Sequence, residues 1–233
     1  MTSFSPVCQP AAESLWHYRH SDEREGLVEC GVWSGRGSPG LRAHFHDEAQ
    51  IVFVLSGSRI FLIDQLVIRV RAGQAAYIPP GLIHASRPTQ EQTICVNLYL
   101  ESSAPAPSLT LFDLGRRETK AVDRTGFPHC LQEGKGDQMR LAGYLADSYG
   151  PIAELAAGLG RSREGFSRLV KREMGIAPHA YRLLTRLNLA RRMLREGQPI
   201  AGVAAEAGFA DQSHLTRLFR STFGTTPGLY RRR

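Results

Sequence analysis

The sequence predicts a two-domain α+β protein, with a β sandwich or barrel first and an all-α domain after it. Residues 27–100 are rich in β-branched and aromatic side chains and are broken by turn signals, while the last third of the 233 residues contains one helical segment written twice. Short strands at such spacing are typical of a sandwich or barrel, and a duplicated segment is typical of a supersecondary unit used twice. We place the boundaries at 1–101 for the β domain, 102–136 for a connector and 137–233 for the helical domain.

Turn-forming residues divide the N-terminal part into short strands. They stand at 35–37, 56–57, 64–65, 72–73 and 79–81. Because side chains alternate along a strand, His44, His46, Glu48 and Gln50 fall on one face. His84, four residues after Pro80, can reach the same cavity.

The segment 102–150 carries the weakest pattern. Residues 102–108 (SSAPAPS) are turn-rich and predict a surface connection, and 113–136 show no sustained period. Residues 137–148 can form an amphipathic helix with its apolar side inward, made of Met139, Leu141, Ala142 and Leu145.

The repeat aligns 151–182 with 199–231, with one extra residue in the second turn. Each copy predicts a short helix that begins near a proline, a tight turn with a glycine, and a second helix that begins at an N-capping residue and ends at a glycine. The second helices are expected at 163–174, after Ser162, and at 212–223, after Asp211, with Gly175 and Gly224 as their ends. Two helices joined in this way form a helix-turn-helix.

Polar and basic side chains occupy the outer face of both second helices. They are Arg163, Glu164, Ser167, Arg168 and Lys171 in the first copy, and Gln212, Ser213, His214, Thr216, Arg217 and Arg220 in the second. Such side chains can contact base edges and phosphates, although a solvated helix face is the usual alternative. The charge distribution favours nucleic acid: residues 151–233 hold 15 Lys and Arg against 6 Asp and Glu, whereas residues 1–150 hold 14 against 16.

Between the copies, residues 178–195 predict one long helix, apolar on one side, that stops at Gly197. At 1.5 Å per residue it would be a rod of about 27 Å. Such a rod could hold two recognition helices near the ~34 Å spacing of successive major grooves on one side of B-DNA.

The stretch GFADQSHLTRLFRSTFGTTPGLYR (208–231) resembles the signature of the AraC/XylS family of bacterial transcription regulators, and 151–233 resembles that family's DNA-binding domain. By position, the resemblance implies base contacts from Glu164, Ser167 and Arg168 in the first motif and from Ser213, His214 and Arg217 in the second. Glu164 departs from the aromatic or amide residue of relatives, so it either accepts from cytosine or repels phosphate.

The segments HFHDEAQIVFVLSG and AGQAAYIPPGLIH resemble the two motifs of the cupin jelly roll, a sensor domain that many of these regulators carry. In cupin enzymes the motif histidines and a carboxylate hold a metal, which makes His44, His46 and His84 candidate ligands. Here Gln50 replaces the usual glutamate, and a neutral amide is a poorer ligand for a dication. We therefore predict polar pocket residues with no metal, no other cofactor and no catalytic residues.

A small-molecule effector is the partner that the cavity favours, because such pockets combine apolar walls with a few convergent polar groups. We predict effector contacts from His44, His46, Gln50, Phe53, Tyr77 and His84. Further candidate walls are Phe45, Leu55, Phe61 and Ile83, and Trp33 is a further polar candidate. For each apolar side chain, ordinary core packing is the competing interpretation.

Several protein classes are disfavoured. The four cysteines, at 8, 30, 95 and 130, have no CxxC spacing, which argues against a disulfide framework or a zinc ribbon; Cys130 beside His129 leaves redox sensing open. No signal-peptide pattern and no run of 18 apolar residues is present, so we expect a cytoplasmic protein with no membrane partner.

These observations predict a DNA-binding transcription regulator controlled by an effector in its cupin-like domain. The family resemblance implies activation through contact with RNA polymerase, leaves repression open, and suggests a homodimer. Two alternatives remain: a cupin metalloenzyme tethered to a DNA-binding domain, and an architectural protein that binds duplexes without an effector.

Overall fold

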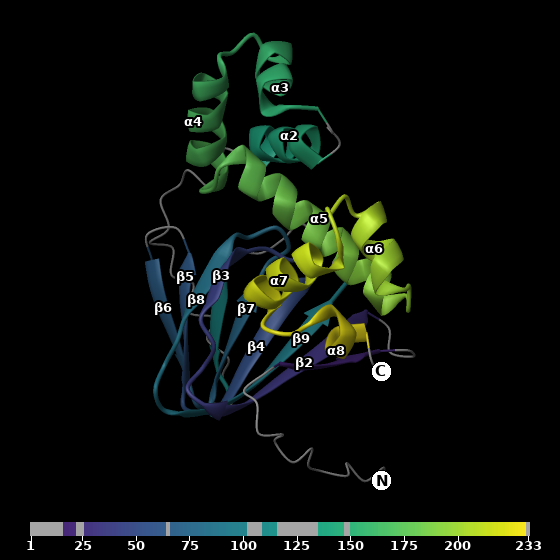
Figure 1. The fold of residues 1–233 in the computed structure, drawn as a ribbon. Helices are drawn as coiled ribbons and strands as arrows, with labels where there is room; N and C mark the ends of the chain where they lie inside the picture. Colours follow the sequence, from purple (N-terminus) through teal and green to yellow (C-terminus); the bar gives the residue numbers. More distant parts are fainter. Residues whose placement is uncertain are drawn as a thin grey trace.

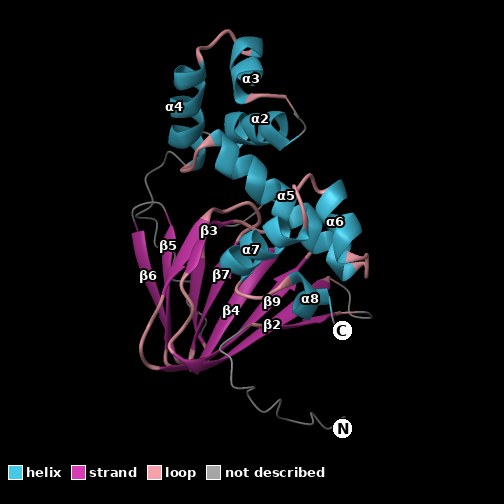
Figure 2. Ribbon diagram, viewed as in Figure 1, coloured by secondary structure: helices cyan, strands magenta, loops and turns pink. Residues whose placement is uncertain are grey.

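Alternation of inward apolar and outward polar side chains forms the ten strands of the N-terminal domain in a computed structural model of the protein (Figures 1 and 2). The structure describes residues 16–21, 26–63, 66–101, 109–115, 135–146 and 150–231. The predicted turn at 64–65, the connection at 102–108, Cys8 and Cys130 lie outside these ranges.

The strands form two antiparallel sheets that face each other. One has six strands in the order β1 (His17–His20), β2 (Leu27–Arg36), β9 (Gln92–Leu100), β4 (Ala49–Ser56), β7 (Gln74–Ile78) and β10 (Thr110–Asp113). The other has four in the order β3 (Leu41–His44), β8 (His84–Arg87), β5 (Ser58–Ile63) and β6 (Leu66–Arg71). The predicted sandwich is confirmed.

Strand β10 lies inside the segment that the sequence assigned to a connector. It pairs with β7, with Thr110 opposite Tyr77 and Asp113 opposite Gln74, and it closes one edge of the six-stranded sheet. The chain therefore adds one more strand to the sandwich after residue 101, and the boundary at 101/102 stays a prediction.

Seven helices follow in the described residues: α2 (Lys135–Ala146), α3 (Ile152–Gly158), α4 (Arg163–Met174), α5 (Pro178–Arg195), α6 (Ile200–Glu206), α7 (Gln212–Phe223) and α8 (Pro227–Arg231). The second helix of each repeat has the predicted bounds because its ends are chemically marked. Ser162 Oγ accepts from the Gly165 amide at 3.1 Å, and Asp211 Oδ1 accepts from the His214 amide at 2.7 Å. Gly175 and Gly224 end these helices with φ of 74° and 71°, which glycine adopts without strain.

The two helix-turn-helix units stand at opposite ends of α5 (Figure 1). Phe166 and Val170 of α4 are buried in the first unit, and Leu215 and Phe219 of α7 in the second, while Leu169 and Leu218 are only partly buried. In Figure 1 the first unit projects away from the sandwich, whereas α7 and α8 lie against the sandwich.

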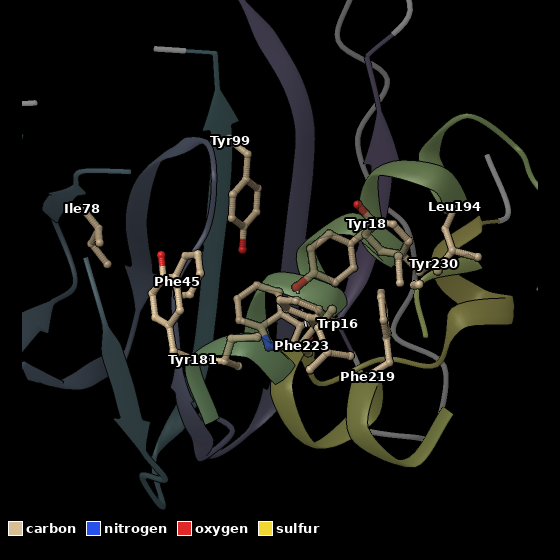
Figure 3. Close-up of a cluster of buried hydrophobic side chains, with 14 of the residues drawn as sticks. Trp16, Tyr18, Phe45, Ile78, Tyr99, Tyr181, Leu194, Phe219, Phe223 and Tyr230 are labelled. Atoms are coloured by element: carbon tan, nitrogen blue, oxygen red, sulfur yellow. Dashed lines mark hydrogen bonds between the residues drawn. The ribbon is translucent and has the colours of Figure 1, made fainter. Parts of the chain in front are cut away.

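The second unit is joined to the sandwich by an aromatic cluster (Figure 3). The Tyr18 hydroxyl donates to the Phe223 carbonyl at 3.1 Å, and the Trp16 amide donates to the Gly224 carbonyl at 3.4 Å. Phe45 stacks on Tyr181 of α5, with ring centroids 5.2 Å apart. One continuous apolar core therefore runs through both domains.

Candidate nucleic-acid interface and effector cavity

Helix α4 exposes the side chains that the sequence proposed for DNA contact. Arg163, Glu164, Arg168 and Lys171 are exposed and Ser167 is half-buried. Phe166 and Val170 point to the opposite side, into the core. The helix therefore has one packed face and one polar face that is free to meet a groove.

Helix α7 repeats this arrangement. Gln212, Ser213, Arg217 and Arg220 are exposed, and His214 and Thr216 are half-buried. The His214 ring leans edge-on against Phe209, with centroids 5.7 Å apart. Phe223, at the end of α7, contacts the sandwich instead, with its ring centroid 6.2 Å from that of His44, so docking leaves the polar face open to solvent.

A small cavity lies between the sheets, under the end of α7. Its volume is about 10 Å³, room for no more than about one water. The lining residues are Tyr18, Leu41, His44, His46, Gln50, Arg59, Phe61, His84, Ser86, Asn97, Tyr99 and Phe223. Phe223 is the last residue of α7 in the helical domain, so one wall of the cavity is supplied by the second helix-turn-helix unit.

Four of the six predicted effector residues meet in this cavity, namely His44, His46, Gln50 and His84. Phe53 and Tyr77 do not line it, and their effector contacts stay predictions. Phe53 stands three residues after Gln50 on β4, an odd spacing that turns it to the other face of the sheet. Tyr77 pairs with Ile51 on the same outer face, while its neighbour Ile78 points inward opposite Gln50.

The five further candidate residues of the cavity lie in different places. Phe61 lines the cavity. Phe45 packs on Tyr181 between the domains, Trp33 is buried in the core, Ile83 is partly buried, and Leu55 is exposed.

The three histidines form a tight, uncharged cluster. Their candidate ligand atoms all lie within 4.8 Å of one another. Nδ1 of His44 lies 2.7 Å from the Arg42 carbonyl, and Nδ1 of His84 lies 2.9 Å from the Leu82 carbonyl, so both rings donate through Nδ1. Burial lowers the pKa of His84 to about 4 and lowers the pKa of His44 and His46 well below 6.5.

A three-histidine metal site does not fit this arrangement. His46 Nδ1 lies 2.6 Å from Nη1 of Arg191, and because a guanidinium only donates, His46 must accept there and carry its proton on Nε2. A protonated Nε2 cannot bind a metal. The nearby carboxylate, Glu48, is instead held by Arg195 at 2.6 Å. This disagreement rests on the donor set alone.

Sequence reasoning missed Arg191, which reaches from α5 into the sandwich. It forms a buried ion pair with Glu29 and a second, at 3.6 Å, with Glu48, and it donates to the Tyr230 hydroxyl at 3.2 Å. Its guanidinium lies 4.3 Å from the centre of the Tyr99 ring. A detectable signal existed: Arg191 follows Leu184 and Leu187 at helical spacing, on the apolar side of α5.

This network connects the two domains electrostatically. Burial alone would raise the pKa of Glu48, but Arg191 and Arg195 hold it below its ordinary value. Asn188, one turn before Arg191, donates to the Phe45 carbonyl at 3.1 Å. Helix α5 therefore contributes three polar side chains to the domain contact, in addition to the apolar ones.

Comparison with known proteins agrees with both halves of the fold. A helix-turn-helix domain family matches residues 155–233, and a cupin domain family matches residues 29–98. The transcriptional activator NphR of a Rhodococcus species is 42% identical over 89 residues, which is 38% of this chain and 26% of that protein. The arabinose operon regulatory protein of Escherichia coli is 32% identical over 116 residues, 49% of this chain and 40% of that protein. The helical part of the chain is therefore similar to the helix-turn-helix part of AraC-type regulators.

The same arrangement of both domains also occurs in a solved structure. Unsaturated fatty acid bound ToxT from Vibrio cholerae superposes with a TM-score of 0.57 at 12% identity, covering 91% of this chain and 96% of that one. At that identity the likeness shows the fold alone. The matched part spans about a quarter to a third of the length of the first curated relatives, 26% to 32%. In the described part of the chain, no helix is both long and apolar enough to cross a bilayer.

Proposed function

We propose that this protein is a sequence-specific DNA-binding transcription regulator of the AraC/XylS type whose grip on DNA is controlled by a small molecule in the cupin-like cavity. One observation carries the proposal. Two capped helices expose polar, basic faces, and the second of them, α7, also supplies a wall of the cavity through Phe223. The same element therefore serves both sites.

The base contacts in this proposal are those of the exposed faces of α4 and α7, with Arg168 and Arg217 at equivalent repeat positions. Arginine is the usual bidentate partner of guanine in the major groove. Docking on the sandwich covers the apolar face of α7 and leaves Arg217 exposed. The cavity thus controls the position of α7, while the polar face of α7 that carries Arg217 stays exposed.

The coupling follows from the size of the cavity. At about 10 Å³ it cannot accept a metabolite while Phe223 stays in place. A ligand that fills the cavity therefore binds better to a state in which the end of α7 has moved. Such a difference in affinity between two states is what allows a ligand to shift their populations.

Selection from random-sequence duplexes with the full-length chain, followed by footprinting, tests the proposal. We expect a preferred sequence protected in two neighbouring major-groove segments, and an affinity that falls with salt by a slope near −0.9 per phosphate contacted. Equal affinity for all duplexes would favour the architectural protein, and no binding at all would overturn the proposal.

A cupin metalloenzyme is the second candidate, favoured by the three-histidine cluster alone. The tautomer of His46 argues against it. Metal analysis of the purified chain decides the point, since less than about a tenth of an equivalent after incubation with zinc or iron would end this alternative.

The family likeness extends the proposal to contact with RNA polymerase, to self-association and to a cytoplasmic location. Sedimentation with and without the selected duplex tests self-association. A transcription assay reconstituted with polymerase and the selected site tests activation against repression.

A further inference from the structure

Among the described residues, no carboxylate pairs with the buried cation Arg59 on β5. Its side chain is 1% exposed and lines the cavity. Its guanidinium carbon lies 5.2 Å from the ring centres of both Trp16 and Phe61. Within the described part of the chain, Nε and Nη1 have no hydrogen-bond partner. Arginine stays protonated in proteins, so the positive charge is present.

Comparison with Arg191 shows how unusual this is. Arg191 is equally buried but meets two carboxylates and a tyrosine hydroxyl. Arg59 lies instead beside the Cys95 thiol, and burial raises the pKa of that thiol, which keeps it neutral. An isolated buried charge costs several kcal/mol, so an unpaired one indicates a missing partner.

The other residues that line the cavity also provide no negative charge. None of the twelve lining residues is an aspartate or a glutamate. Nε2 of His46 carries a proton and is a further buried donor without a described partner. The cavity therefore offers one positive charge and one neutral N–H group, both fully enclosed, and no negative charge to meet them.

We infer that the effector is a monocarboxylate with an apolar or aromatic body, its carboxylate bound by Arg59 and His46 Nε2. Arginine pairs with carboxylates through two parallel bonds. One guanidinium balances one negative charge, and the three neutral histidines add none, which disfavours a phosphate dianion. The rings of Tyr18 and Tyr99 supply apolar walls, and displacement of Phe223 makes room for the body of the ligand. This inference rests on the proposed function, because it names the ligand class of the same cavity.

Calorimetry on the full-length chain with benzoate and octanoate, and with benzyl alcohol and octanol as neutral counterparts, tests the inference. We expect at least one carboxylate to bind and its alcohol to bind at least about tenfold more weakly. Arg59→Met should weaken carboxylate binding by about 10- to 100-fold, while Arg69→Met on the exposed face of β6 should leave it unchanged. Equal binding of acids and alcohols, or no binding of either acid, overturns the inference.

A second measurement needs no ligand. Because Arg59→Met removes an unpaired charge and keeps an apolar side chain of similar length, the ligand-free variant should melt at a higher temperature than the wild type. A lower melting temperature would mean that the guanidinium has a structural partner, and would overturn the inference.

Failure of the two proposals can be told apart by footprinting with benzoate or octanoate present. Arg59-dependent binding that leaves the footprint unchanged would keep the carboxylate site and reject its regulatory role. A sequence-specific footprint with no carboxylate binding would keep the DNA-binding function and reject the carboxylate.

Discussion

Arg168 and Arg217 permit a residue-by-residue test of base reading. Both are exposed on the second helix of their repeat, away from the core. Each change to Ala should lose about 1 to 3 kcal/mol on the selected site and relax one base preference. Titrations on the selected duplex and on single-base variants measure this.

Arg172→Ala is the matched control, because Arg172 lies on α4 and its ion pair with Glu173 is solvent-exposed. It should alter binding little. If Arg168→Ala weakened binding equally on every duplex, Arg168 would be a phosphate contact and not a base reader.

His84 predicts a pH dependence of stability. Burial lowers its pKa to about 4, while the unfolded chain titrates near 6.5. Between these values the unfolded state binds more protons, so stability is full above about pH 6.5 and is lost as the pH falls toward about 4. The shift of the His84 pKa corresponds to roughly 3 kcal/mol over that window.

Urea unfolding between about pH 7 and pH 5 measures this slope. His84→Gln should flatten it, and His44 and His46, shifted in the same direction, account for what remains. His179→Gln on the exposed side of α5 should leave the slope unchanged. A wild-type stability that is constant over this range would contradict the prediction.

Single residues also mark the limit of the sequence-based assignment. His44, His46, Gln50 and His84 were found because motif and strand period agree. Phe53 and Tyr77 lie outside the cavity lining because their odd spacing from Gln50 turns them to the other face of the sheet. Arg59 and Glu29 could not have been assigned from composition, since a charge inside a sandwich is recognised only when the inward face of its strand is known.

At the scale of one element, Gly224 is where the end of α7 meets the sandwich. Its φ is +71°, and a Cβ there would lie 2.5 Å from Cδ1 of Trp16. Gly224→Ala should therefore lower the free energy of unfolding by more than the roughly 1 to 2 kcal/mol of a left-handed residue.

Gly197→Ala separates the two contributions, since Gly197 has φ of +81° and nothing within 4 Å of its would-be Cβ. Urea titration of both variants measures the difference. Equal losses in the free energy of unfolding would mean that Trp16 moves aside without cost and that its contact with the new Cβ does not lower stability.

Elements were predictable where their ends carry a chemical signal. The bounds of α4, α5 and α7 match the predicted ranges because prolines, N-caps and glycines mark them. The weakly patterned helix at 137–148 is observed at Lys135–Ala146, with Leu141 and Leu145 buried. Strand β10 was missed because four residues after a proline-rich stretch carry no period that can be read.

For the whole molecule, we expect the buried Glu29–Arg191 ion pair to make the two domains unfold in a single transition. Both tryptophans belong to the sandwich side, whereas the helices belong to the other domain, so tryptophan fluorescence and far-ultraviolet circular dichroism report on different domains. In the wild type the two signals should change together.

In Arg191→Leu they should separate, because the buried Glu29 loses its Arg191 partner and keeps only the 3.4 Å ion pair with Arg195, at a cost of up to about 3 to 5 kcal/mol. Combining this change with Glu29→Leu should recover much of the loss. Coincident transitions in the single variant would show that the aromatic contacts alone couple the domains.

The long-range contacts explain why the docking of the domains was not predicted. Glu29 and Arg191 stand 162 positions apart, and Tyr18 and Phe223 stand 205 apart. Local pattern determines helices and strands, but not which face of α5 meets the other domain.

The aromatic contact between the domains also bears on how the protein can be handled. An excised helical fragment would present Phe223, Tyr181 and the uncompensated guanidinium of Arg191 to water. An exposed apolar and basic surface of this kind promotes aggregation and nonspecific binding to nucleic acid. DNA affinities measured with the excised fragment would therefore not apply to the full-length chain.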